Sequence, residues 1–96
     1  MIVILISEIK THPKVPEIEQ ILSAGAAAQN ILIASHSLGY TAIWRTGFLA
    51  FNEEVSISFG LDKSDIIIGY LYIGSTDKKL EAPEVSNFND FVYKWS

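Results

Sequence analysis

Residues 16–38 read PEIEQILSAGAAAQNILIASHSL, and this stretch decides the fold. Pro16 suits the first turn of a helix, and Glu17 and Glu19 place negative charge where the helix dipole favours it. Gly39 follows as a plausible left-handed stop. We therefore predict one long helix over residues 16–38.

The predicted helix has no single polar face, because its few polar side chains are spread around the circumference between apolar ones. A helix that is apolar almost all round is usually buried almost all round. Gly25, near its centre, is destabilising in a helix interior unless another backbone packs closely against it. We expect the helix to be enclosed by other elements, with its closest packing around Gly25.

Two apolar stretches also resemble membrane-directed segments. Residues 20–39 carry no charged side chain, but several of their polar groups would be costly in lipid, namely Gln29, Asn30, Ser35, His36 and Ser37. Met1–Ile6 resembles the core of a signal peptide, but it lacks the basic start and the small-residue cleavage site. We expect a buried helix, and no membrane partner.

The rest of the chain supplies strands, a short helix and an arm. Residues 1–7 are continuously apolar, which is typical of an interior strand covered on both faces. Residues 40–45 and 66–74 predict two further strands, and residues 52–59 a short helix. Residues 75–96 predict a polar arm with an aromatic end that docks on the same subunit or on a partner. Together these form a single domain without internal repeats.

Composition limits the possible partners. The 96 residues are 49% hydrophobic and only 19% charged. Such a balance suits either a compact monomer with an apolar surface or an obligate oligomer, and we favour the oligomer. The net charge is −4 and the basic residues are scattered, so nucleic acid is not an expected partner. The absence of cysteine excludes disulfides and thiolate metal sites, and it fits a reducing cytoplasm.

Arg45 is the residue that chemistry alone singles out. It ends a predicted strand and precedes Thr46 and Gly47, and a guanidinium, a hydroxyl and a glycine backbone together can hold a phosphate. The alternative is an arginine paired with a carboxylate at a strand end. His36 is a proton-transfer candidate by residue type, although a histidine on a buried helix is more often a satisfied core or interface residue. His12 is far from it along the chain, so a metal site is not expected.

An ordered set of motifs resembles the nitroreductase family, most closely its branch of small single-domain NAD(P)H nitroreductases. The resemblance runs from Met1 to about Thr76, and its spacing is more specific than any single piece. The motifs are Lys14 to Gln20, Ser23 to Asn30, Leu38-Gly39-Tyr40, Ile43 to Gly47, and Ile66 to Gly74.

The resemblance implies an α+β fold with a mixed β-sheet packed on a long central helix. It also implies two subunits that wrap around each other, with FMN in the dimer interface and an arm that embraces the other subunit. The family's FMN-contacting stretch maps to Trp44, Arg45 and Thr46. A region assigned to nicotinamide-cofactor binding maps to Ala34, Ser35, His36, Ser37, Leu38 and Gly39.

Only the C-terminal half of the family pattern is present. In the family, the segments that bind the FMN phosphate and cradle the flavin ring come before this half, and this sequence does not contain them. The resemblance implies an oxidoreductase that uses FMN and NAD(P)H to reduce nitro compounds or similar small-molecule acceptors. With half of the pocket, we expect the chain alone to be inactive. The alternative is a non-catalytic oligomeric remnant or fragment that binds flavin weakly or not at all. Unpaired sheet edges would then be available for pairing between molecules.

Overall fold

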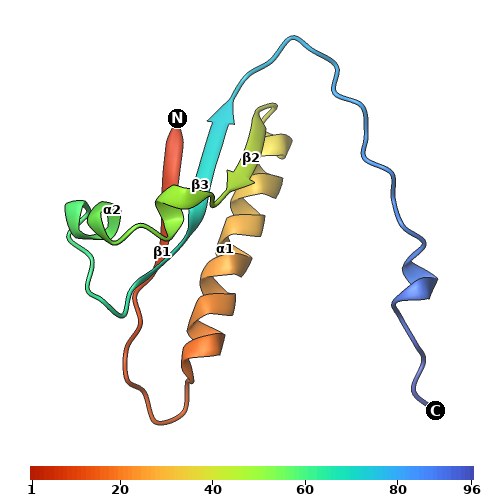
Figure 1. Cartoon of the computed structure of the whole chain (residues 1–96). Helices are drawn as coiled ribbons and strands as arrows, with labels where there is room; N and C mark the ends of the chain where they lie inside the picture. The colour runs from red at the N-terminus through yellow and green to blue at the C-terminus, as the bar shows by residue number, and fades with distance from the viewer.

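The computed structural model describes all 96 residues as an α+β body with a detached C-terminal arm (Figure 1). The expected α+β class is therefore confirmed. The elements in chain order are β1 (Ile2–Ser7), α1 (Glu17–Ser37), β2 (Thr41–Arg45), the 3₁₀ turn η1 (Phe48–Ala50), α2 (Glu53–Ser58), β3 (Ile66–Gly74) and the 3₁₀ turn η2 (Phe88–Asp90).

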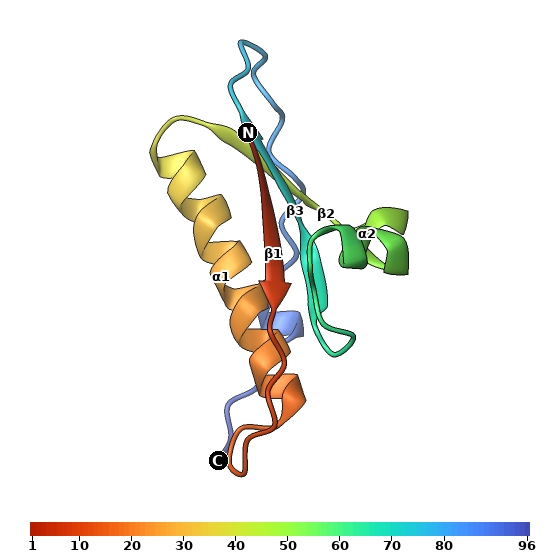
Figure 2. The same ribbon diagram turned by 90° about the vertical axis from the view of Figure 1, so that its left-hand side faces the viewer.

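The sheet has the strand order β1-β3-β2, and both pairings are antiparallel. The expected mixed sheet is thus not found among these three strands. The central strand β3 runs opposite to both of its neighbours, and no two adjacent strands run in the same direction. Figure 2 shows α1 on one face of the sheet and α2 toward the other, so the sheet lies between unequal helical layers.

The position of β1 corrects the expectation of an interior strand, because β1 lies at the edge of the sheet. Its continuous apolar run has another cause. The side chains of Ile4 and Ile6 pack against a small core made by η1, α2 and β3, whereas Val3 and Leu5 alternate toward the face that α1 covers. Both faces of β1 are therefore partly covered without a second flanking strand.

The core on the α2 side centres on Ala50, Ile67 and Tyr70, with Val55 and Leu61 packed around them. The hydroxyl of Tyr70 donates a hydrogen bond to the carbonyl oxygen of Leu49 at 3.1 Å. This bond joins the segment that follows β2 to the central strand. The bond fixes η1 over the part of the opposite sheet face that is lower in Figure 1. We call the sheet face opposite α1 the open face, because its upper part carries no helix.

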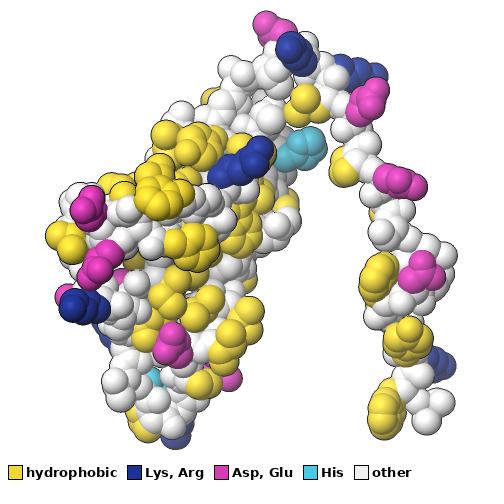
Figure 3. Space-filling view, in the orientation of Figure 1, with side chains coloured by type: hydrophobic (Ala, Val, Ile, Leu, Met, Phe, Trp, Pro, Cys, Tyr) yellow, Lys and Arg dark blue, Asp and Glu magenta, His cyan; other side chains and the backbone are white.

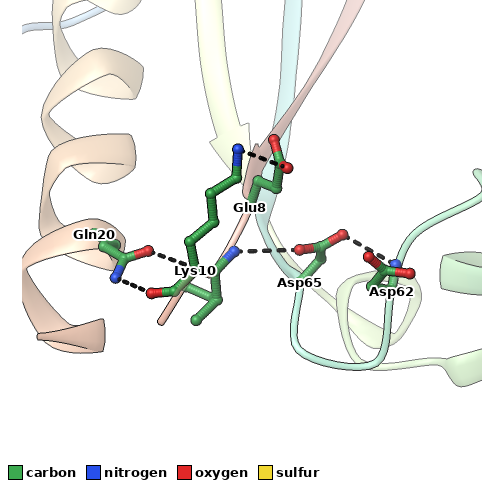
Figure 4. Close-up of polar contacts among 6 residues, drawn as sticks. Glu8, Lys10, Gln20, Asp62 and Asp65 are labelled. Atoms are coloured by element: carbon green, nitrogen blue, oxygen red, sulfur yellow. Dashed lines mark hydrogen bonds and ion pairs between the residues drawn. The ribbon is translucent and has the colours of Figure 1, made fainter. Parts of the chain in front are cut away.

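The start of α1 is tied to the body by side-chain hydrogen bonds (Figure 4). The amide of Gln20 donates to the carbonyl oxygen of Lys10 at 2.8 Å and accepts from the Lys10 N–H at 2.9 Å. The carboxylate of Asp65 accepts from the N–H groups of Ile9 and Asp62 at 3.2 and 3.0 Å. The loop between β1 and α1 is therefore held at both of its ends.

The expectation that α1 is buried almost all round is wrong within one chain. Its buried residues are Ala28 and Ser35, on the flank that faces the sheet. Apolar side chains on the other flank are more than half exposed, namely Ile18, Leu22 and Ile33. A single layer of sheet can cover only one side of a helix, so the outer flank has no partner in this chain. None of the helices combines the length and hydropathy needed to cross a membrane.

The arm, residues 75–96, leaves the end of β3 and stands away from the body (Figures 1 and 2). Its large apolar side chains are exposed, and Trp95 is 99% exposed. Figure 3 shows hydrophobic side chains at intervals along the arm and gathered over the body. The surplus of apolar residues in the composition is therefore visible as uncovered surface.

Candidate functional site

Trp44 faces the helix rather than the open side of the sheet. Its indole Nε1–H donates to the carbonyl oxygen of Ile68 at 3.1 Å, and its far ring edge lies against Gly25 of α1. The ring also covers Gly69, where a Cβ atom would come within 2.1 Å of the indole nitrogen. Trp44 is thus seated between two glycines, and its polar atom is already bonded within the chain.

Arg45 lies on the other face, because successive strand residues alternate across the sheet. It pairs in register with Tyr70, whose side chain belongs to the core on the open face. The Arg45 side chain is exposed and makes no ion pair, since the single ion pair of the chain joins Lys10 to Glu8 at 3.1 Å. The alternative of an arginine paired with a carboxylate is therefore not found, and the guanidinium remains available for an anion.

Thr46 and Gly47 carry the chain out of β2 beside Arg45. Gly47 has φ 61° and ψ −167°, a conformation that side-chain-bearing residues rarely adopt. The turn sends the chain from β2 into η1, and Thr46 at its start is exposed. The guanidinium of Arg45 and the hydroxyl of Thr46 are therefore both exposed where β2 ends.

The surroundings of Arg45 suit the phosphate end of FMN, but they do not enclose a flavin ring. Its neighbours on the upper open face are Ile43, Tyr72 and Ile2, which are 47%, 41% and 58% exposed. They form an apolar surface, but nothing in this chain rises above it to enclose a flavin ring. The residues present suit a phosphate, and they provide no walls for a ring.

The end of α1 is the second predicted region. His36 and Gly39 line a cavity of about 530 Å³, together with Tyr40 and Thr41 at the start of β2 and with Lys78 from the root of the arm. The cavity is lined by the imidazole of His36 and the ammonium group of Lys78, and also by the carboxylate of Glu81, so its charged groups are of both signs.

The other predicted residues at this helix end are less available as contacts. Ser35 is buried, and its hydroxyl donates to the carbonyl oxygen of Ile31 at 2.8 Å. Leu38 lines a neighbouring cavity of about 430 Å³. Ala34 and Ser37 are exposed on the helix surface.

The structure does not bring the two predicted regions together. Gly39 precedes β2 and Arg45 ends it, so they lie at opposite ends of the strand. A strand rises about 3.4 Å per residue, which separates Thr41 from Arg45 by about 14 Å. Only an extended ligand, or two ligands in line along β2, could contact both regions at once.

The sequence contained a signal for the packing of Trp44 against Gly69 that the sequence analysis did not use. An isolated glycine inside a strand, such as Gly69, indicates a bulge or a close approach of another group. Both are present, because the register between β1 and β3 shifts beside Gly69 and the indole covers it. The tethers made by Gln20 and Asp65 had no comparable signal, since they depend on how the loops meet.

Residues 2–75 match the model of the nitroreductase family. The chain belongs to the nitroreductase family. It is 34% identical over 79 residues to the Escherichia coli K12 protein named "Putative NAD(P)H nitroreductase YdjA", and 32% identical over 83 residues to a Haemophilus influenzae protein with the same family name. These matches cover 82% and 85% of this chain but only 43% and 45% of the relatives, so the chain spans less than half of their length.

A solved structure shows the same fold. The nitroreductase-like protein from Bacillus cereus superposes with a TM-score of 0.80 over 96% of this chain and 49% of its own, at 22% identity. The arrangement of α1 on the antiparallel strands is therefore a nitroreductase-like arrangement. The expected family membership and the expected half-length match are both confirmed.

Proposed function

We propose that this chain is part of an FMN-dependent oxidoreductase that passes reducing equivalents from NAD(P)H to nitro compounds or similar small acceptors. Membership of the nitroreductase family supports the oxidoreductase class, and the relatives are named for NAD(P)H. The flavin supplies the redox chemistry, while the protein supplies position and charge. The observation that carries the proposal is the unpaired guanidinium of Arg45 at the end of β2, with Thr46 beside it.

In this proposal Arg45 and Thr46 bind the FMN phosphate, and Trp44 contributes through the strand that it anchors, with its ring turned to α1. The segment from Ala34 to Gly39 contributes to nicotinamide-cofactor binding through His36 and Gly39, which line the cavity at the helix end. Because the two regions lie at opposite ends of β2, the residues that would hold the FMN phosphate are separate from those that would bind the nicotinamide cofactor.

The assembly that we propose is a homodimer in the cytoplasm. The outer flank of α1 presents Ile18, Leu22 and Ile33 without a partner, and the arm presents a row of exposed aromatic side chains. Large uncovered apolar surfaces usually mark interfaces. A second subunit would cover the flank of α1, receive the arm and supply walls for the surface beside Arg45.

The test is flavin binding by the purified chain, followed by the absorbance and quenched fluorescence of FMN. Arg45→Ala should weaken binding by at least about tenfold, because a hydrogen bond to a charged group contributes roughly 1.5–3 kcal/mol. Lys14→Ala is the matched control, since it removes the same charge from an exposed loop distant from β2. Equal affinity for FMN in both variants would rule out Arg45 as the phosphate contact.

The second candidate function is a non-catalytic oligomer, and one observation favours it: no segment of this chain encloses the surface beside Arg45. A protein that is folded by circular dichroism, but carries no flavin absorbance after incubation with FMN and removal of unbound FMN, would support this alternative and contradict the flavoenzyme.

A further inference from the structure

Tyr70 is the cross-strand neighbour of Arg45 on the open face. The two residues pair in register between β2 and β3. Side chains that face each other in such a pair have Cβ atoms about 4.5–5.5 Å apart. The Tyr70 side chain is buried in the core, whereas Arg45 is exposed. The guanidinium that we propose as a phosphate contact therefore starts beside the base of a fixed aromatic side chain.

The hydroxyl of Tyr70 reaches the segment that follows Arg45. It donates to the carbonyl oxygen of Leu49 at 3.1 Å, and Ala50 belongs to the same buried cluster as Tyr70. Among the hydrogen bonds made by residues 46–51, the bond from Tyr70 is the one that joins them to the sheet. The base and the tip of one side chain therefore fix the two ends of the segment that carries Thr46.

The turn between these two fixed points has an uncommon backbone conformation. Gly47 has φ 61° and ψ −167°, a region that almost only glycine adopts. Such a conformation persists where the surrounding structure determines it. The backbone bonds from Ala50 to Gly47 and from Phe51 to Phe48 lie within the segment itself. The bond from Tyr70 to Leu49 is therefore the restraint that relates this turn to the sheet.

A buried tyrosine hydroxyl usually finds a hydrogen-bond partner, so a bond of this kind is by itself no sign of function. The location of this bond adds a second observation. Its acceptor belongs to the same short segment as Thr46, and the phenol ring is the cross-strand neighbour of Arg45. Groups that bind one ligand together need a fixed spacing, which supporting side chains provide. A side chain that holds both groups therefore contributes to the affinity for their common ligand.

We infer that Tyr70 is a positioning residue, whose hydroxyl holds Thr46 in place relative to Arg45 and so favours FMN over riboflavin, which lacks the phosphate. The inference rests on the proposed function, because it requires Arg45 and Thr46 to be the phosphate contacts. Tyr70 acts through the turn and not on the ligand, since its hydroxyl is bonded to Leu49. The flavin ring is common to both ligands, so a difference between them reports on the phosphate contacts alone.

Binding of FMN and of riboflavin to the purified chain, followed by flavin fluorescence, tests this role. Tyr70→Phe keeps the ring and removes the hydroxyl. It should weaken FMN binding by about two- to tenfold, the range expected from one hydrogen bond, and leave riboflavin binding unchanged. Tyr93→Phe is the matched control, because its hydroxyl donates to the carbonyl oxygen of Asp90 at 3.4 Å on the detached arm. Equal weakening of both flavins by Tyr70→Phe would indicate a purely structural role and overturn the inference.

Gly47→Ala disturbs the same turn without altering the core around Tyr70. A Cβ atom at this position would meet no other atom within 4 Å, so the change acts through backbone conformation. It should also weaken FMN binding and leave riboflavin binding unchanged, which keeps the test decisive if Tyr70→Phe does not fold. If Arg45→Ala loses FMN affinity while a folded Tyr70→Phe keeps it, this inference is wrong and the proposed function stands. A wild-type chain that binds FMN no more tightly than riboflavin would overturn both.

Discussion

Trp44 shows most clearly how one side chain organises this chain. The sequence analysis assigned it two roles, core packing by residue type and flavin contact by resemblance, and the structure places its ring between Gly25 and Gly69. The choice depends on which face of β2 turns toward α1, and a strand of five residues does not reveal that from its sequence. A contact at Gly25 was expected, but packing so close that it requires glycine is not found, since a Cβ atom there would lie 3.8 Å from Trp44. The hydrogen bond to Ile68 could not be predicted.

The two glycines that hold Trp44 should respond to alanine in opposite ways. At Gly69 a Cβ atom would lie 2.1 Å from the indole nitrogen, so Gly69→Ala should lower the free energy of unfolding by roughly 1–3 kcal/mol. At Gly25 an added Cβ atom would lie 3.8 Å from the nearest atom of Trp44, which is an ordinary van der Waals contact. Gly25→Ala should therefore raise stability by up to about 1 kcal/mol through helix propensity. Urea unfolding checks both variants, and the same sign for both would contradict this account of the packing.

The helices and strands lie close to the residue ranges that the sequence indicates. Their burial and their neighbours differ from what the sequence indicates. Pro16 and the acidic residues at the start of α1 are local signals, and so is the apolar run of β3, so the extents of both elements can be predicted. The partial burial of β1 at the sheet edge depends instead on η1 and α2 folding back over Ile4 and Ile6. Such contacts join residues about 45 positions apart, and no local pattern encodes them.

The short helix α2 provides a test of local capping. The side chain of Asn52 accepts a hydrogen bond from the N–H of Val55 at 3.1 Å. Asn52→Ala should lower the free energy of unfolding by about 1 kcal/mol, the usual contribution of a side-chain N-cap. Asn87→Ala is the control, because Asn87 makes the same kind of bond, to Asn89 at 3.1 Å, on the detached arm. If thermal unfolding is equally sensitive to both variants, the arm is more tightly coupled to the body than the structure indicates.

At the scale of the whole molecule, composition predicted the main outcome. A chain of 96 residues that is 49% hydrophobic leaves much apolar surface uncovered, and the outer flank of α1 and the arm are where that surface lies. The candidate site was likewise predicted only in part. Arg45 and Thr46 were predicted to bind an anion from their order at a strand end, and the structure leaves both exposed, so their role stays a prediction. The open surface beside Arg45 was expected only through the family resemblance, since no local pattern of residues indicates what encloses a site.

Substitutions in the arm test the proposed homodimer. Replacing Phe88, Phe91 and Trp95 by serine should raise the dimer dissociation constant at least about tenfold, because burying even one large apolar side chain contributes roughly 1.5–3 kcal/mol. Sedimentation equilibrium gives the constant, and circular dichroism checks that the body stays folded. Serine at Glu84, Asn89 and Lys94 is the control, with the same number of changes at polar arm positions. An unchanged constant in the aromatic variant would show that the arm takes no part in association.

The two tryptophans sit in opposite environments, which gives the protein a built-in optical reporter. The indole of Trp44 is packed against α1 and hydrogen-bonded, whereas Trp95 is 99% exposed at the end of the arm. Emission from Trp44 should shift to longer wavelength only when β2 separates from α1, while emission from Trp95 should shift to shorter wavelength only when the arm is covered. With the other tryptophan replaced by phenylalanine, each gives a separate signal, so opening of the body and docking of the arm can be timed in parallel stopped-flow experiments on the two single-tryptophan variants.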